Sequence, residues 1–143
     1  MSLRFMELAI EQAKKSGRDI PVGAVLVLDG EVIATAHNEK EKNQDPTLHA
    51  EMIVIKKASS ILENWRLSRC ELYVTLEPCP MCAWAIIQSR IQRVYFGSYD
   101  SLYGALISKM DLRKASNSSL EVFGGIMEQE CDNILNEFFR DLR

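Results

Sequence analysis

The sequence has no long apolar run and no excess of positive charge. No stretch reaches the roughly 18 apolar residues of a membrane span, and the N-terminus does not open a secretory signal pattern. The formal net charge is −3, so no global basic field attracts a nucleic acid, and any polyanionic partner must meet a local patch. We therefore expect a cytoplasmic protein that has no membrane partner.

Repeats, low-complexity tracts and linkers rich in proline, glycine or serine are also missing from the chain. Its 143 residues suffice to bury roughly two thirds of the surface that the unfolded chain exposes. One hydrophobic core is expected at this length. We therefore expect a single domain over residues 1–143.

The spacing of apolar residues predicts helices that alternate with strands. Helices are expected over residues 2–16, from about 48 to 60, from 78 or 80 to about 87, and over 128–143. Strands are expected over 22–28, 31–35, 72–75, 93–97 and 122–123. Asp29-Gly30 supplies the positive φ angles of a tight hairpin turn between the first two strands. This order favours a layered α/β sandwich with an antiparallel hairpin at one side of a partly parallel sheet.

Histidine and cysteine are scarce, with two and four residues in the whole chain. His49 lies two residues before Glu51, and Cys79 and Cys82 lie in the sequence Pro-Cys-Pro-Met-Cys. In a cytosolic chain, a Cys-x-x-Cys pair is more often a metal or redox motif than a structural disulfide. One imidazole and two thiols can hold a tetrahedral zinc ion whose fourth position stays open for water.

Helix geometry restricts where such a site can lie. Residues two apart in a helix interior point about 200° away from each other, so His49 and Glu51 converge only off the N-terminal end of a helix. Cys79 and Cys82 can share one face in a first helical turn, and the flanking prolines suit a helix start. Two helix starts would then face one ion and favour the thiolate forms, which leaves Glu51 as the base.

Two other interpretations of these residues remain open. A Cys-x-x-Cys pair is equally at home in redox folds, although here it comes late in the chain and lacks the usual tryptophan-glycine lead-in. A closed structural zinc site would need the second histidine, His37. Neighbouring strand residues face opposite ways, so His37 is not a ligand if Asn38 faces the pocket.

The motifs resemble those of the zinc-dependent cytidine and nucleobase deaminase superfamily, which carries a His-x-Glu and a Pro-Cys-x-x-Cys signature. Within it, the chain is similar to the bacterial tRNA-specific adenosine deaminase family. The resemblance covers most of residues 6–140, and its main segments are Ile20 to Val25, Asp45 to Glu51, Asn64 to Leu67, Leu72 to Cys79 and Ser89 to Ile91.

The resemblance implies an α/β fold, a three-layer cytidine-deaminase-like sandwich with a mixed sheet of about five strands flanked by helices. It implies one zinc ion per chain on His49, Cys79 and Cys82, with Glu51 as the catalytic proton shuttle. Zinc-bound hydroxide would attack C6 of adenosine and ammonia would leave, giving inosine. In the family, Asn38 and the backbone N–H of Ala50 occupy positions that bind the target base.

The resemblance also implies a homodimer that acts on the anticodon wobble position of a tRNA. In the family, the end of the last helix, here Phe138 to Arg140, lies near the anticodon loop, where aromatic and arginine side chains can stack on bases. Packing against the core is the other interpretation of these phenylalanines.

Two departures from the family pattern bear on the substrate. Trp84 stands where a glycine is usual, and Leu102 stands where a lysine is common. Fewer cations weaken the salt-dependent part of RNA binding. A free-base cytosine or guanine deaminase with the same zinc site is therefore the first alternative, and a non-catalytic zinc-stabilised subunit is the second.

Overall fold

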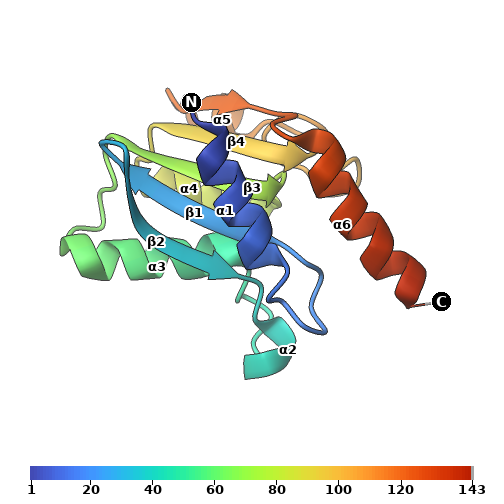
Figure 1. The fold of residues 1–143 in the computed structure, drawn as a ribbon. Coiled ribbons are helices and arrows are strands. Elements are labelled where there is room, and N and C mark those ends of the chain that lie inside the picture. The colour runs from blue at the N-terminus through green and yellow to red at the C-terminus, as the bar shows by residue number, and fades with distance from the viewer. Residues whose placement is uncertain (143) are drawn as a thin grey trace.

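The computed structural model describes residues 1–142, which form a mixed five-stranded sheet between two layers of helices (Figure 1). The strands lie in the order β2-β1-β3-β4-β5. Their bounds are Gly23–Leu28 for β1, Glu31–His37 for β2, Cys70–Leu76 for β3, Arg93–Ser98 for β4 and Glu121–Phe123 for β5. β1 pairs antiparallel with β2 and β3, whereas β3, β4 and β5 are parallel. The predicted fold class is confirmed.

Four helices cover the two faces of this sheet. α1 (Leu3–Ala13) and α6 (Glu128–Asp141) lie on one face, and α3 (Ala50–Leu62) and α4 (Pro80–Gln88) lie on the other. Two short helices, α2 (Lys40–Asn43) and α5 (Leu112–Ser116), lie in connecting segments. The four long helices were predicted within a few residues, but the short ones carry too few turns for a periodic signal. Within residues 1–142, none of the helices is long and apolar enough to cross a membrane.

The central strands bury both of their faces because successive side chains alternate across the sheet. Leu26, Leu72 and Val74 pack toward α3 and α4. Val25 and Tyr73 point the other way and pack against α1. The sheet is therefore held between two apolar layers, and the helices on each face are fixed by side chains from the same strands.

One edge of the sheet collects chain segments that are far apart in the sequence. Gly23 at the start of β1 pairs with His37 at the end of β2, and its neighbour Ala24 pairs with Val74 near the end of β3. Leu76 then pairs with Ser98 at the end of β4. The exits of β2, β3 and β4 thus lie together, and in sheets of this kind ligands bind beyond the carboxyl ends of the strands.

Candidate metal and catalytic site

His49 and Cys79 are the residues directly before α3 and α4. Both have an extended backbone, with φ −75° and ψ 151° at His49 and φ −73° and ψ 173° at Cys79. Neither side chain caps its own helix, so both are available to a ligand. Pro80 occupies the first position of α4, where its missing N–H costs nothing. Cys82 follows in the first turn and is buried, so the three side chains lie at two helix starts, as the spacing predicts.

The distances among these three side chains fit a zinc ion. His49 Nδ1 lies 3.6 Å from Cys79 Sγ and 3.5 Å from Cys82 Sγ. All three ligand atoms lie within 4.8 Å of one another. A tetrahedral ion with Zn–N of about 2.0 Å and Zn–S of about 2.3 Å separates nitrogen from sulfur by about 3.5 Å. One nitrogen and two sulfurs also leave a fourth position for another ligand.

The two thiols have opposite protonation tendencies. A hydrogen bond from Cys82 lowers the pKa of Cys79 to about 4. The pKa of Cys82 is raised because it donates that bond and is buried. The pKa of His49 is raised by its hydrogen bond to Cys79. Metal ligands must be deprotonated, so metal uptake releases protons at this site.

Glu51 is a buried carboxyl group beside these ligands. It lies in the first turn of α3 and is 4% exposed. Burial raises its pKa to about 7. A carboxyl group whose pKa lies near neutrality can both accept and return a proton. The group therefore suits general acid and base chemistry.

A pocket of about 290 Å³ lies beside these residues, beyond the carboxyl ends of β2, β3 and β4. This is the small end of the range for ligand pockets and suits a single nucleobase. Its walls come from five separate parts of the chain, and the lining residues are Ile20, Val22, Asn38, Lys40, His49, Glu51, Leu76, Glu77, Cys79, Asp100 and Tyr103.

Asn38 lines the pocket, and its side chain is held on both sides. Its Oδ1 accepts a hydrogen bond from the Ala50 N–H, and its Nδ2 donates to the Ile20 carbonyl, both at 2.8 Å. A second Nδ2 hydrogen and a second Oδ1 lone pair remain for a ligand. The Ala50 N–H donates to Asn38, and Ala50 is fully buried and is not one of the residues that line the pocket. His37 lies in a neighbouring hollow, outside the metal cluster.

Glu77 is a pocket residue that sequence analysis did not single out. It is 2% exposed, and its carboxylate accepts hydrogen bonds from Asp100, Ile107 and Ser108. Burial opposes its ionisation, but these hydrogen bonds hold its pKa below the ordinary value. The sequence did contain a signal for Glu77: it is a carboxylate directly before Pro78, at the end of an apolar strand.

Comparison with known proteins relates this site to deaminases. Residues 1–98 match the family described as cytidine and deoxycytidylate deaminase zinc-binding region. The chain is 47% identical to the tRNA-specific adenosine deaminase of Bacillus subtilis (strain 168), over 97% of this chain and 89% of the relative. It is 43% identical to a solved tRNA:A34 deaminase that performs A-to-I editing, with a TM-score of 0.90 over 94% of this chain and all of the other.

A guanine deaminase from Nitrosomonas europaea shares the fold more distantly. It has a TM-score of 0.85 but only 19% identity, over 96% of this chain and 84% of the other. At that identity, the similarity concerns the fold alone.

The metal cluster generates the first prediction. Cys79→Ser should remove most of the bound zinc and lower the melting temperature, because ligands at two helix starts couple metal binding to folding. Atomic absorption and thermal unfolding measure both effects. Cys131→Ala is the control, since Cys131 is likewise a free cysteine but is buried on the opposite face of the sheet. The control should lose stability while keeping its zinc. Full zinc content in Cys79→Ser would refute the ligand assignment.

Proposed function

This chain belongs to the cytidine and deoxycytidylate deaminase family, among its tRNA-specific adenosine deaminases, and from that premise we propose that it converts adenosine to inosine at the anticodon wobble position of a tRNA. The reaction adds water at C6 of the base and releases ammonia. The observation that supports it best is the buried Glu51 carboxyl beside an open three-ligand cluster. A purely structural zinc site does not require that carboxylate.

The metal ligands, Glu51 and Asn38 have separate roles in the reaction. When bound at His49, Cys79 and Cys82, zinc supplies Lewis-acid activation of water at neutral pH. Glu51 takes a proton from the attacking water and delivers it to N1 of the purine ring. It then moves the proton of the new C6 hydroxyl to the C6 amino group, which leaves as ammonia while the C6 carbonyl of inosine forms. The second Nδ2 hydrogen and the second Oδ1 lone pair of Asn38 bind the base and fix its orientation, so that C6 lies where the reaction occurs.

Glu51→Ala tests this assignment. Turnover should fall by at least about 10²-fold, because a general acid and base is lost, whereas zinc content should equal that of the unaltered protein. The assay measures inosine in a short anticodon stem-loop with adenosine at the wobble position, in parallel with free cytosine and free guanine.

The outcomes of that assay separate the candidates. Deamination of a free base with no inosine in the stem-loop would favour the free-base alternative. Activity on none of the three would favour a non-catalytic role. Loss of zinc in Glu51→Ala would instead make the carboxylate a metal ligand.

A cationic rim, defined as Lys15, Arg18, Lys40 and Lys42, supports RNA as the substrate despite the net charge of −3. Lys40 lines the pocket, and the other three line an adjoining hollow of about 370 Å³. Asn38 borders both spaces. We propose that phosphates flanking the target nucleotide contact this rim, because phosphates are the main source of protein affinity for nucleic acids.

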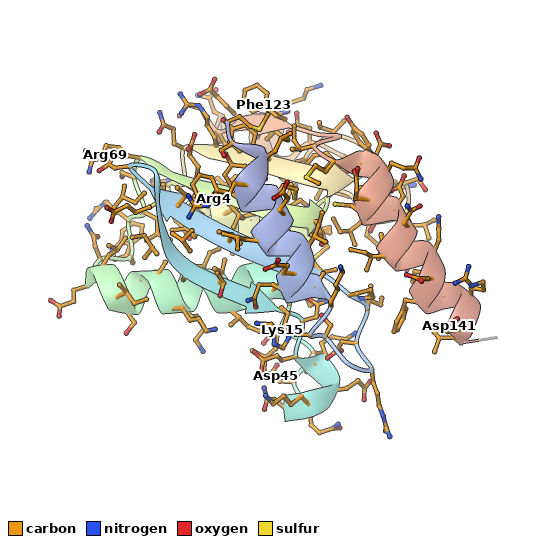
Figure 2. The ribbon with its side chains drawn as sticks, viewed as in Figure 1. Arg4, Lys15, Asp45, Arg69, Phe123 and Asp141 are labelled. Carbon is orange, nitrogen blue, oxygen red and sulfur yellow. The ribbon has the colours of Figure 1, made fainter. Side chains whose placement is uncertain are left out.

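Removing two cations of the rim should weaken binding of the stem-loop. In the double variant Lys15→Ala/Arg18→Ala, the slope of log affinity against log salt should fall by about one to two, since each phosphate contact on a single strand contributes about 0.7. Fluorescence anisotropy at several salt concentrations measures it. Arg4→Ala/Arg69→Ala is the control, because Figure 2 shows both side chains apart from Lys15, with Arg4 near the opposite end of α1. An equal change in both double variants would argue against the rim.

The sequence of α4 supports a homodimer. The helix has no charged residue from Pro80 to Gln88, yet Trp84 on its outer side is 44% exposed. Helices that are apolar on all sides are normally covered. Large apolar side chains of the nearby loop, Leu102, Tyr103, Ile107 and Met110, are also exposed. We propose that a second copy of the chain covers this face.

The mass in solution tests the dimer. Trp84→Glu should convert it to a monomer, because a charge would be buried without a partner at the interface, and light scattering after size exclusion reports the mass. Phe139→Glu is the matched control, since Phe139 is also an aromatic residue with 44% exposure but lies on α6, across the sheet. A monomeric unaltered protein, or a Trp84→Glu dimer, would contradict the proposed interface.

We propose that this activity takes place in the cytoplasm. Cys70, Cys79, Cys82 and Cys131 are all free thiols in the described chain. Free thiols are typical of reducing compartments, where a tRNA substrate is also found.

A further inference from the structure

The connection between β4 and α5, residues 99–111, forms one wall of the pocket and is called here the wall loop. It has no helix or strand of its own. Asp100 and Tyr103 line the pocket, while Ala105 and Leu106 are fully buried. A loop without regular secondary structure needs other partners for its backbone N–H groups when it is held against the core.

Glu77 provides these partners. Its Oε1 accepts hydrogen bonds from the Asp100 N–H at 3.1 Å and from the Ser108 hydroxyl, and its Oε2 accepts from the N–H groups of Ile107 and Ser108, both at 2.8 Å. Two bonds to each oxygen use the roughly four acceptor sites of a carboxylate. Glu77 therefore has no acceptor site left for substrate or for water, which excludes a role as a proton shuttle.

The wall loop also approaches Glu77 closely. A Cβ atom at Gly104 would lie 2.4 Å from Cδ of Glu77 and 2.5 Å from the Asp100 carbonyl oxygen. The Ala105 N–H donates to the carbonyl of Pro78 at 2.9 Å. The short segment from Glu77 to Cys79 thus carries both the contacts that hold the loop and one of the metal-ligating thiols.

The Asp100 side chain in turn fixes the backbone of Tyr103. Its Oδ1 accepts hydrogen bonds from the N–H groups of Leu102 and Tyr103, both at 3.0 Å. Because Glu77 holds the Asp100 backbone and Asp100 holds the Tyr103 backbone, the two pocket-lining residues share one chain of hydrogen bonds.

We propose that Glu77 is a positioning residue that fixes the wall loop relative to the metal-ligating segment, and thereby sets how tightly the pocket holds the target nucleotide. The effect on substrate rests on the proposed deaminase function, whereas the effect on the loop does not. Glu77 acts through Asp100 and Tyr103 and does not touch the reacting atoms.

The test variant is Glu77→Gln, which keeps the size of the side chain but points an amide NH₂ group at backbone donors. Amide hydrogen exchange across residues 99–111 should become at least about tenfold faster, because the local opening is made easier. Exchange in β1 and α3 should not change, and zinc content should equal that of the unaltered protein. Ser108→Ala, which removes one donor and keeps both oxygens of Glu77, should produce a smaller change in the same loop.

The control is Glu71→Gln. Glu71 lies on the same strand at the far end from the pocket, and its carboxylate also accepts hydrogen bonds, from Arg93 and Tyr95. This variant should lower thermal stability without altering exchange in the wall loop, so it separates positioning from general destabilisation.

Kinetics on the anticodon stem-loop complete the test. For Glu77→Gln, KM should rise roughly tenfold while kcat changes less than about threefold. The reason is that the pocket binds the substrate less tightly, whereas the proton shuttle Glu51 is unchanged. Unchanged loop exchange would overturn the proposal, as would a fall in kcat at constant KM. If Glu77→Gln does not fold, Ser108→Ala decides by the direction of the change: faster exchange in the wall loop with a raised KM supports the proposal, and unchanged loop exchange overturns it. If the unaltered protein does not deaminate the stem-loop, the proposed function fails, and hydrogen exchange still decides whether Glu77 holds the loop.

Discussion

The meeting of two helix starts is the constraint on which the rest of the site depends. α3 and α4 pack on the same face of the sheet, and their first turns contribute fully buried residues, Ala50 and Ala83, to one core cluster. This packing brings His49 and Cys79 together from segments thirty residues apart. The N-terminal ends of both helices favour negative charge, and of the two thiols it is Cys79 whose pKa is lowered, to about 4, chiefly by its hydrogen bond from Cys82.

The mixed sheet explains why the other pocket residues lie around this point. Because β2 and β1 are antiparallel while β3 and β4 are parallel, the ends of β2, β3 and β4 share one edge. Asn38 directly follows β2, Glu77 directly follows β3, and Asp100 lies two residues beyond β4. Much of the pocket is therefore assembled from strand exits. Hydrogen bonds from the Ala50 N–H, at the start of α3, to Asn38 and from the Asp100 N–H to Glu77 keep its walls at fixed positions.

Charge is distributed unevenly over the molecule. The acidic residues that give the net charge of −3 include Glu128, Glu130 and Asp141 of α6, whereas Lys15 and Arg18 lie beside the pocket. Asp141 marks the far end of α6 in Figure 2, well away from the sheet. On α6, Phe139 is exposed and packs edge-on against the partly buried Phe138. Lys15, Arg18 and Lys42 share their hollow with Asp19 and Glu41, so the proposed phosphate contacts depend on individual cations and not on a uniformly positive surface.

The sequence by itself indicated a zinc site with an adjacent carboxylate, because His49, Cys79 and Cys82 belong to scarce residue types and the rules that place them at helix starts are local. His49, Cys79 and Cys82 needed only spacing and prolines, and the long helices and strands followed from periodicity. The tertiary structure alone decided which residues surround them. Ser108 reaches Glu77 from 31 positions away and Ala50 reaches Asn38 from 12, and such partners depend on strand order and register, which no local pattern encodes.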